Sequence, residues 1–178
     1  KKAAHEQGTK RMMVDQQIFA GRYTFQQIQA LPNLGEQFNA YDTVDNQPVL
    51  IKRPSPDQPV ADMVSAFQEA LDTESIVLNT APLDTHPGVY RLLRTESAEG
   101  WWYAYRYLVF SQPGGKPLSE LAFPLTEATI VTVLTRLADV LCAAQQAGYC
   151  HGAITSETIY WDVKRQQVQV INWGQAIP

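Results

Sequence analysis

The order of strand and helix patterns along the chain constrains its fold more than any other feature of the sequence. Short runs of β-forming residues, separated by turn residues, fill most of the first 110 residues. One helical pattern interrupts these runs after a proline-rich stretch, and the pattern becomes mainly helical from Pro117 onward. This order predicts an α+β chain with a strand-rich first part and a helical second part.

Five strands are expected in the first part, and the fifth is unusually rich in aromatic residues, which favour packing within a sheet. They are expected at residues 19–28, 37–42, 49–52, 89–93 and 101–110. Near the end of the sequence, two further short strands at residues 158–161 and 167–171 are separated by a polar turn. We expect this pair to form a hairpin.

Two amphipathic helices are expected, at residues 61–78 and 126–148, with a short helix at 117–121 between them. On the first helix Glu74 lies on the apolar face, where a carboxylate needs a cationic partner. On the second, Thr126 can cap the start and Gly148 the end. The apolar face of the second helix has spacings of four and three: Ile130, Leu134, Leu137, Leu141 and Ala144.

Composition excludes several classes of protein. The 178 residues are 45% hydrophobic, which is normal for a globular chain, and the formal charge of −4 leaves no basic footprint for nucleic acid. No apolar run approaches the roughly 18 residues that a membrane span needs. Cys142 and Cys150 are too few for a disulfide framework, and we expect them to be buried in a cytoplasmic protein. No cluster of residues has the spacing of metal ligands.

Six short motifs, taken in order, resemble those of the protein kinase superfamily over residues 20–176. They are a glycine-rich loop at residues 30–35, the strand Val49-Leu50-Ile51-Lys52, the turn His86-Pro87-Gly88-Val89, a hinge at residues 107–118, a catalytic loop at His151-Gly152-Ala153 and a metal-binding turn at Asn172-Trp173-Gly174. The resemblance implies a protein kinase-like α+β fold, with a five-stranded antiparallel N-lobe carrying one helix and a truncated helical C-lobe.

The same resemblance implies a division of the chain into three parts. Residues 1–19 would be a linker or loose helix, and residues 20–111 the kinase-like N-lobe. Residues 112–178 would hold the hinge and a partial C-lobe made of the long helix, a degenerate catalytic loop and the hairpin. If the second lobe is naturally this short, the long helix exposes an apolar side that kinases cover, and such a patch usually marks an interface with a partner.

A vestigial nucleotide site also follows from the resemblance. Lys52 would pair with a carboxylate of the first helix, for which Glu74 is our choice and Glu69 the alternative. Phe110 would occupy the gatekeeper position, behind the adenine pocket. The residues of this site are Gly35, Lys52, Glu74, Phe110 and Gln112.

The side chains that would perform phosphoryl transfer are replaced. Ala153 stands where kinases have the general base, Thr158 where they have a metal-binding Asn, and Asn172 where they have a metal-binding Asp. Alanine accepts no proton, and neutral side chains do not supply the charge that holds Mg²⁺. Only Gly35 survives from the glycine-rich loop, in which Pro32 also removes a backbone donor. We therefore expect no catalytic residue, no metal site and no cofactor, neither ATP nor Mg²⁺.

These expectations favour a pseudokinase: a catalytically inactive regulatory or protein–protein interaction module within a larger protein. Its partner would be a separate protein or another domain of the parent chain, and we expect neither nucleic-acid nor membrane binding. Two alternatives stay open. A hinge backbone that still holds adenine would make a nucleotide-binding conformational sensor. Relocated acids, for which Glu157 and Asp162 are candidates, would make an atypical Ser/Thr protein kinase with weak activity.

Overall fold

The computed structural model of the chain describes residues 17–25, 28–31, 35–55, 61–99 and 104–178, with side chains of the first helix from residue 65 onward. Most of the predicted linker, the centre of the predicted glycine-rich loop and the aromatic residues 101–103 lie outside the described residues.

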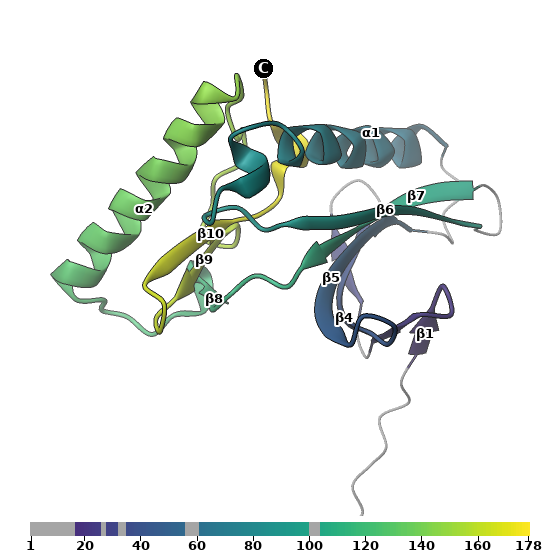
Figure 1. Cartoon of the computed structure of the whole chain (residues 1–178), viewed down its shortest axis with the longest axis horizontal. Coiled ribbons are helices and arrows are strands. Elements are labelled where there is room, and N and C mark those ends of the chain that lie inside the picture. Colours follow the sequence, from purple (N-terminus) through teal and green to yellow (C-terminus); the bar gives the residue numbers. More distant parts are fainter. Residues whose placement is uncertain (1–16, 26–27, 32–34, 56–60, 100–103) are drawn as a thin grey trace, which may run out of the picture.

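An antiparallel sheet of seven strands forms the larger part of what the structure describes (Figure 1). The strands lie side by side in the order β1-β2-β4-β5-β7-β6, and β3 also pairs with β4. Their bounds are Gln17–Phe19 for β1, Tyr23–Phe25 for β2, Gln29–Leu31 for β3, Gly35–Asp42 for β4, Gln47–Pro54 for β5, Leu92–Glu99 for β6 and Ala104–Ser111 for β7. The central strands β5 and β7 carry consecutive buried residues because both faces of the sheet are covered there.

Helix α1, Ala61–Leu78, packs against the sheet and has the bounds that the sequence predicted (Figure 1). Its side chains Phe67, Leu71 and Leu78 are buried. Glu74 is buried on the same helix, 2% exposed, so its carboxylate does lie on the apolar face. After α1, a 3₁₀ turn at Leu83–Thr85 leads the chain back to β6.

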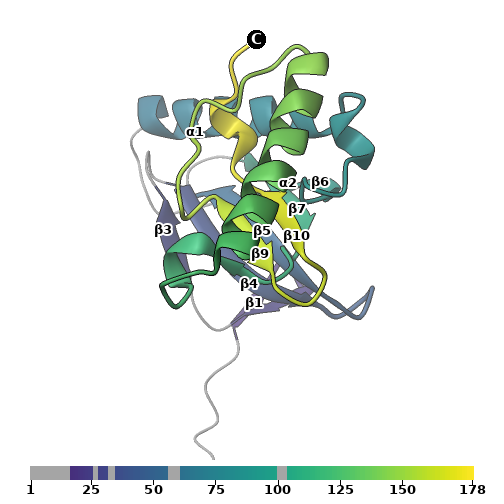
Figure 2. The same ribbon diagram turned by 90° about the vertical axis from the view of Figure 1, so that its left-hand side faces the viewer.

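Helix α2, Glu127–Gln146, lies against a second sheet of three strands (Figure 2). This sheet has the order β10-β9-β8, with β8 at Lys116–Pro117, β9 at Ile159–Asp162 and β10 at Gln167–Val170. The hydroxyl of Thr126 accepts the backbone N–H of Thr129 at 3.2 Å and caps the helix, as predicted. Gly148 follows the helix with a φ of 84°, a left-handed conformation that glycine adopts without strain.

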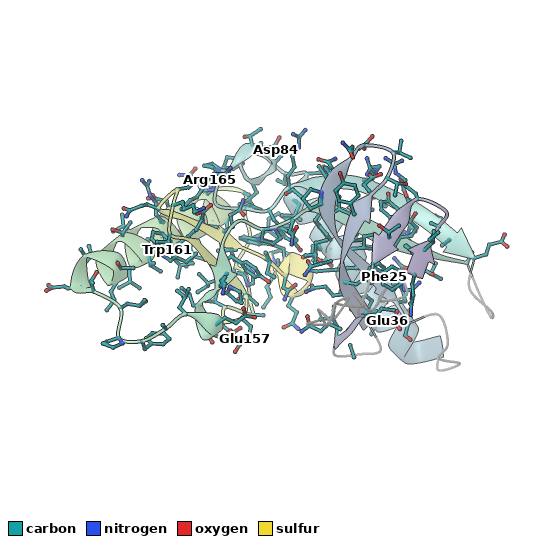
Figure 3. All side chains as sticks on the ribbon, turned by 90° about the horizontal axis from the view of Figure 1, so that it is seen from below. Phe25, Glu36, Asp84, Glu157, Trp161 and Arg165 are labelled. Carbon is teal, nitrogen blue, oxygen red and sulfur yellow. The ribbon has the colours of Figure 1, made fainter. Side chains whose placement is uncertain are left out.

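Two apolar clusters fill the two faces of the large sheet. One joins α1, α2 and the small sheet and includes Leu71, Phe110, Trp161 and Trp173. The other lies on the opposite face of the large sheet and is mainly aromatic, with Phe25 among its members. Trp161 and Phe25 mark these separate clusters in Figure 3. A parallel bridge between Val89 and Val170 links the small sheet to the chain that leads into β6.

The predicted fold class, a protein kinase-like α+β fold with a five-stranded N-lobe and a truncated helical C-lobe, is wrong. The described residues form ten strands and two α-helices, so the chain is mostly β, and the first sheet has seven strands. No helical lobe follows in the described residues, because the segment after β7 returns through β8 and pairs with β9. The predictions missed β1, β3 and β8, which are each only two or three residues long.

Three residues of the predicted apolar repeat of α2 face outward, whereas Leu137 is half-buried and Ala144 is buried. Ile130, Leu134 and Leu141 are 44%, 59% and 37% exposed. The buried side of the helix is formed instead by small and β-branched residues, which allow a close approach to β10. These buried residues are Val133, Val140, Ala143 and Ala144.

Two further features complete the description of the surface. Cys142 and Cys150 are both exposed and free, so the prediction that they are buried is wrong. Among the described helices, none combines the length and the apolar character needed to cross a membrane.

Candidate functional site

A buried ion pair between Lys52 and Glu74 forms the centre of the candidate site. Lys52 Nζ lies 2.8 Å from Glu74 Oε1 and 3.0 Å from Oε2. The two side chains are each 3% exposed, so the pair is shielded from water. Glu69, the alternative partner, is exposed on α1.

Four elements meet at this pair. Lys52 lies on β5, opposite Leu108 of β7, and Glu74 reaches it from α1. Tyr90 precedes β6, and Asn172 follows β10 in a left-handed conformation with a φ of 67°. Asparagine tolerates this conformation better than most residues do. We call Lys52, Glu74, Tyr90 and Asn172 the Lys52 cluster.

Every donor of the Lys52 ammonium is engaged within the cluster. An ammonium has three N–H donors. Besides the Glu74 carboxylate, Lys52 Nζ donates to the Tyr90 hydroxyl at 2.7 Å and to Asn172 Oδ1 at 2.6 Å. The Lys52 ammonium therefore has no donor left for a phosphate oxygen unless one of these bonds breaks.

The Glu74 carboxylate is satisfied in the same way. Its Oε1 accepts hydrogen bonds from the Tyr90 hydroxyl and from the backbone N–H of Trp173, the latter at 2.8 Å. The Trp173 side chain is completely buried, and its indole N–H donates to the carbonyl of Val170 at 3.1 Å. These bonds hold the turn after β10 against α1. The cluster therefore links the small sheet to α1 and the large sheet.

Burial sets the protonation of the cluster. Desolvation lowers the pKa of Lys52, while the Glu74 carboxylate acts in the opposite direction. Desolvation, and then the Glu74 carboxylate, raise the pKa of Tyr90 well above its usual value. The Tyr90 phenol therefore keeps its proton and donates it to Glu74, which is the role that its hydrogen bond requires.

A cavity of about 210 Å³ lies beside the cluster and is lined by five of the predicted site residues. They are Lys52, Glu74, Ala153, Thr158 and Asn172. The structure thus brings together residues that are far apart in the sequence. The other three predicted residues, Gly35, Phe110 and Gln112, do not line this cavity.

Those three residues have other surroundings. Gly35 lies against Phe67 of α1, and a Cβ on Gly35 would come within 2.0 Å of the Phe67 ring. Phe110 is fully buried and its ring stacks on Tyr90, with ring centroids 4.4 Å apart. Gln112 is exposed in the segment after β7. Phe67 also lines the cavity, so its ring fills the space next to Gly35 at the start of β4.

The loop that contains Ala153 is held by its own hydrogen bonds. The Thr158 hydroxyl accepts the backbone N–H of Thr155 at 2.9 Å and lies 3.3 Å from the Ala153 carbonyl oxygen. His151 Nε2 lies 2.9 Å from the carbonyl oxygen of Ile171, and its Nδ1 accepts the N–H of Ala153. Burial lowers the pKa of His151, so the neutral ring is the favoured form. Thr158 and His151 therefore stabilise the conformation of this loop.

Sequence reasoning missed Tyr90 and Phe67 as members of this site. Tyr90 was expected only as part of a strand and Phe67 only as part of an apolar face. The hydroxyl of a buried tyrosine needs a hydrogen-bond partner, and a buried glutamate such as Glu74 needs hydrogen-bond donors. These two requirements together would have suggested Tyr90 as a partner of Glu74. No sequence signal indicated that Phe67 would pack on Gly35.

A comparison with models of known protein families finds no match for this chain, and neither does a comparison with curated protein sequences. The resemblance of the short motifs to protein kinases therefore stays a prediction. Among the described residues, no group of three or more His, Cys, Asp or Glu side chains is placed to hold a metal ion.

Proposed function

We propose that this chain is a non-catalytic regulatory or protein-interaction module that uses an apolar stripe on α2 to bind a partner. The stripe consists of Ile130, Val131, Leu134 and Leu141. Its partner is a separate protein or another domain of the parent chain. The exposure of this stripe is the observation that carries the proposal.

The stripe differs from scattered apolar residues on a surface. Its members recur at helical spacing, so they form one continuous face beside the buried side of α2. Val131 and Leu134 are more than half exposed, and Phe123, just before the helix, is 70% exposed. A contiguous apolar patch of this kind usually marks an interaction site.

The Lys52 cluster supports the non-catalytic part of the proposal. All three donors of its ammonium are bonded within the cluster. The cavity beside it, about 210 Å³, is smaller than the roughly 300–1,000 Å³ of typical small-molecule sites. Ala153, at the position predicted for the general base, brings no acid or base side chain to the cavity. These features weigh against the nucleotide-sensor alternative.

Glu157 and Asp162 were the candidates to replace the missing catalytic acids in the alternative hypothesis of an atypical kinase. Asp162 Oδ1 accepts the backbone N–H groups of Lys164 and Arg165, which closes the turn between β9 and β10. Glu157 is exposed and bonds to its neighbour Ser156. Neither residue lines the cavity beside Lys52, so neither supports the atypical-kinase hypothesis.

The cytoplasm is our proposed compartment, because Cys142 and Cys150, both exposed and free, stay reduced there.

Photo-crosslinking in cells tests the interaction. The photoreactive residue p-benzoylphenylalanine replaces Leu134 in one variant and Val163 in another. Val163 is the matched control because it is apolar and 64% exposed, like Leu134, but lies in the turn between β9 and β10. We expect a discrete protein adduct, or an internal crosslink to another domain, from position 134 only. No adduct at position 134, or equal adducts from both positions, would contradict the proposal.

A thermal-unfolding experiment tests the non-catalytic part separately. We expect the melting temperature to be unchanged by ATP, with or without Mg²⁺, because Lys52 is already fully bonded. A rise of several degrees that requires both ATP and Mg²⁺ would show that the nucleotide site is intact.

A further inference from the structure

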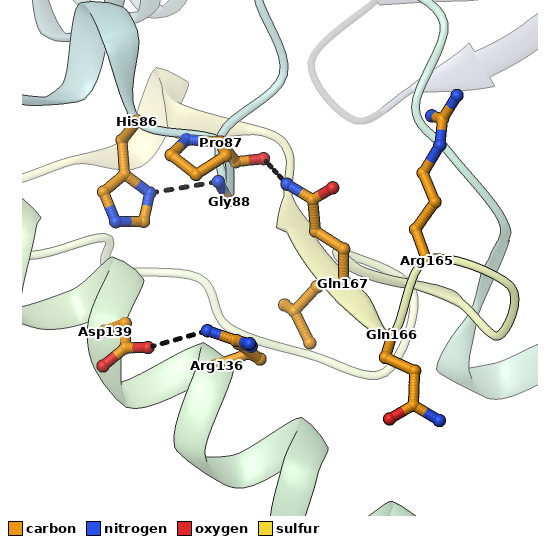
Figure 4. Close-up of a pocket in the computed structure, with 9 residues that line it drawn as sticks. His86, Pro87, Gly88, Arg136, Asp139, Arg165, Gln166 and Gln167 are labelled. Carbon is orange, nitrogen blue, oxygen red and sulfur yellow. Dashed lines mark hydrogen bonds and ion pairs between the residues drawn. The ribbon is translucent and has the colours of Figure 1, made fainter.

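A polar trough lies on the molecule away from the Lys52 cavity, where three segments meet (Figure 4). These segments are the turn before β6 with His86, the middle of α2 with Arg136 and Asp139, and the turn and first residues of β10 with Arg165 and Gln167. Its volume is about 450 Å³, within the range of ligand sites. Six of the nine residues that line it have polar or charged side chains, which suits a hydrophilic ligand.

Two guanidinium groups in the trough are weakly engaged. Arg136 lies 3.8 Å from Asp139, and Arg165 lies 3.9 Å from Asp162, which is beyond hydrogen-bonding distance in both cases. Both arginine side chains are more than half exposed. A guanidinium carries five N–H donors in a planar fork that matches a carboxylate, so each arginine can bind one.

The turn that carries Arg165 is well ordered by hydrogen bonds. Asp162 Oδ1 accepts the backbone N–H groups of Lys164 at 2.9 Å and of Arg165 at 3.1 Å. Across the trough, the side-chain amide of Gln167 donates to the carbonyl of Pro87 at 2.6 Å. These bonds fix the backbone that presents Arg165, which lowers the entropic cost of binding.

His86 contributes a neutral donor. Its Nδ1 accepts the backbone N–H of Gly88 at 3.1 Å, so the proton of the neutral ring is on Nε2. Burial lowers the pKa of His86, and the Asp139 carboxylate opposes this shift. Asp139 is the acidic side chain that lines the trough, and Asp162, 3.9 Å from Arg165, lies outside its lining.

The two arginines do not point at one spot. Figure 4 shows Arg165 pointing away from Arg136, which extends from α2 on the other side of the trough. A compact anion therefore reaches one guanidinium, whereas a chain with carboxylates several ångströms apart reaches both. We propose that the trough binds an extended acidic peptide segment, with one carboxylate on Arg136 and another on Arg165. This inference concerns a second surface, and it stands whether or not the apolar stripe of α2 has a partner.

Fluorescence anisotropy at low salt tests the proposal with a labelled nonapeptide of alternating glutamate and serine. We expect saturable binding to the chain, weakened about threefold by Arg136→Gln or Arg165→Gln and about tenfold by both together. Lys164→Gln is the matched control, because it removes the same charge one residue from Arg165 but does not line the trough. This control should leave the affinity unchanged.

Three results would overturn the proposal. The first is the absence of saturable binding by the glutamate peptide. The second is an equal loss of affinity in Lys164→Gln and Arg165→Gln, which would indicate general charge attraction. The third is complete displacement of the peptide by inorganic phosphate at equal charge concentration, which would indicate a site for one small anion. Circular dichroism of each variant, in which only exposed side chains change, verifies that the chain remains folded.

Discussion

Asn172 accepts a hydrogen bond from the ammonium of Lys52 at 2.6 Å, although 120 residues separate them in the sequence. This bond joins the turn after β10 to the centre of the large sheet. Asn172 holds a left-handed backbone conformation to make it, and Trp173 next to it donates to Glu74. The cluster therefore couples the small sheet to the large one through hydrogen bonds among the buried side chains of Lys52, Glu74 and Tyr90 and the half-buried Asn172.

Replacing Lys52 should show how much the buried pair matters. Lys52→Met removes the cation and leaves the Glu74 carboxylate buried without its partner, so we expect a loss of about 3–5 kcal/mol in the free energy of unfolding. The double variant Lys52→Met, Glu74→Leu removes both charges and should recover part of that loss. Urea denaturation at neutral pH measures all three proteins.

The control for that experiment is an exposed ion pair, Arg106 with Asp72, whose side chains are 52% and 37% exposed. Arg106→Met should cost about 0–1 kcal/mol, because solvent screens the pair. A cost for Lys52→Met no larger than that of the control would show that the cluster does not hold the two sheets together.

Two substitutions of Asn172 separate its hydrogen bond from its backbone conformation. Asn172→Gly and Asn172→Ala both lose the bond to a charged donor, at about 1.5–3 kcal/mol. Alanine also pays about 1 kcal/mol for the left-handed conformation, with a φ of 67°, which glycine adopts freely. Thermal unfolding should rank the proteins as wild type, then glycine, then alanine. If alanine is as stable as glycine, the turn does not retain this conformation.

The contact between Gly35 and Phe67 predicts a compensating pair of substitutions. A Cβ at position 35 would lie 2.0 Å from the Phe67 ring, so Gly35→Ala should destabilise the chain by about 1–3 kcal/mol through overpacking. Phe67→Leu shortens the side chain and should reduce the cost of Gly35→Ala in the double variant. Denaturant unfolding of the two single variants and the double variant gives the coupling energy. Purely additive effects would show that the two residues do not touch.

The exposed apolar residues of α2 should tolerate polar substitutions, although their helical spacing alone suggests that they belong to a core. Leu134→Ser should change the free energy of unfolding only slightly, by about 0.5 kcal/mol, because the side chain is 59% exposed. Val140→Ala, on the buried side, should cost about 2 kcal/mol from lost apolar burial and the cavity that forms. Equal costs at both positions would mean that the stripe is covered within the chain itself.

How far the sequence predicts this structure depends on the range of the interactions involved. The bounds of α1 and the cap at Thr126 follow from local signals, and the structure confirms them. The helix pattern alone indicated only that Glu74 needs a cation, and the motif resemblance was what pointed to Lys52 as its partner. The two-residue strand β8 depends on β9, a partner far along the chain, so no local pattern shows it. Strand β3 pairs with β4, the next strand in the sequence, but its three residues are too few for a recognisable strand pattern. Which side of α2 is buried is also decided by its neighbours, since apolar residues occupy both sides.

His151 predicts a pH dependence of stability. Burial lowers the pKa of His151, because desolvation disfavours the charged ring, while the Ile171 carbonyl acts in the opposite direction. Its folded-state pKa lies below its unfolded value, so the unfolded chain binds more protons as the pH falls. The contribution of His151 is therefore fully present above the unfolded pKa, about 6.5, and is lost as the pH falls from there toward the folded-state pKa.

His151→Gln keeps a polar side chain without a titratable ring, so it should lower stability at pH 7.5 and flatten the dependence between about pH 7 and 5. Denaturant unfolding across this range gives the slope for each protein. His86→Gln is the comparison, because burial lowers the pKa of His86 as well, but its side chain is only half-buried. The slope should change more for His151→Gln than for His86→Gln. An unchanged slope in His151→Gln would mean that the pKa of His151 is the same in the folded and unfolded chains, which would contradict the prediction.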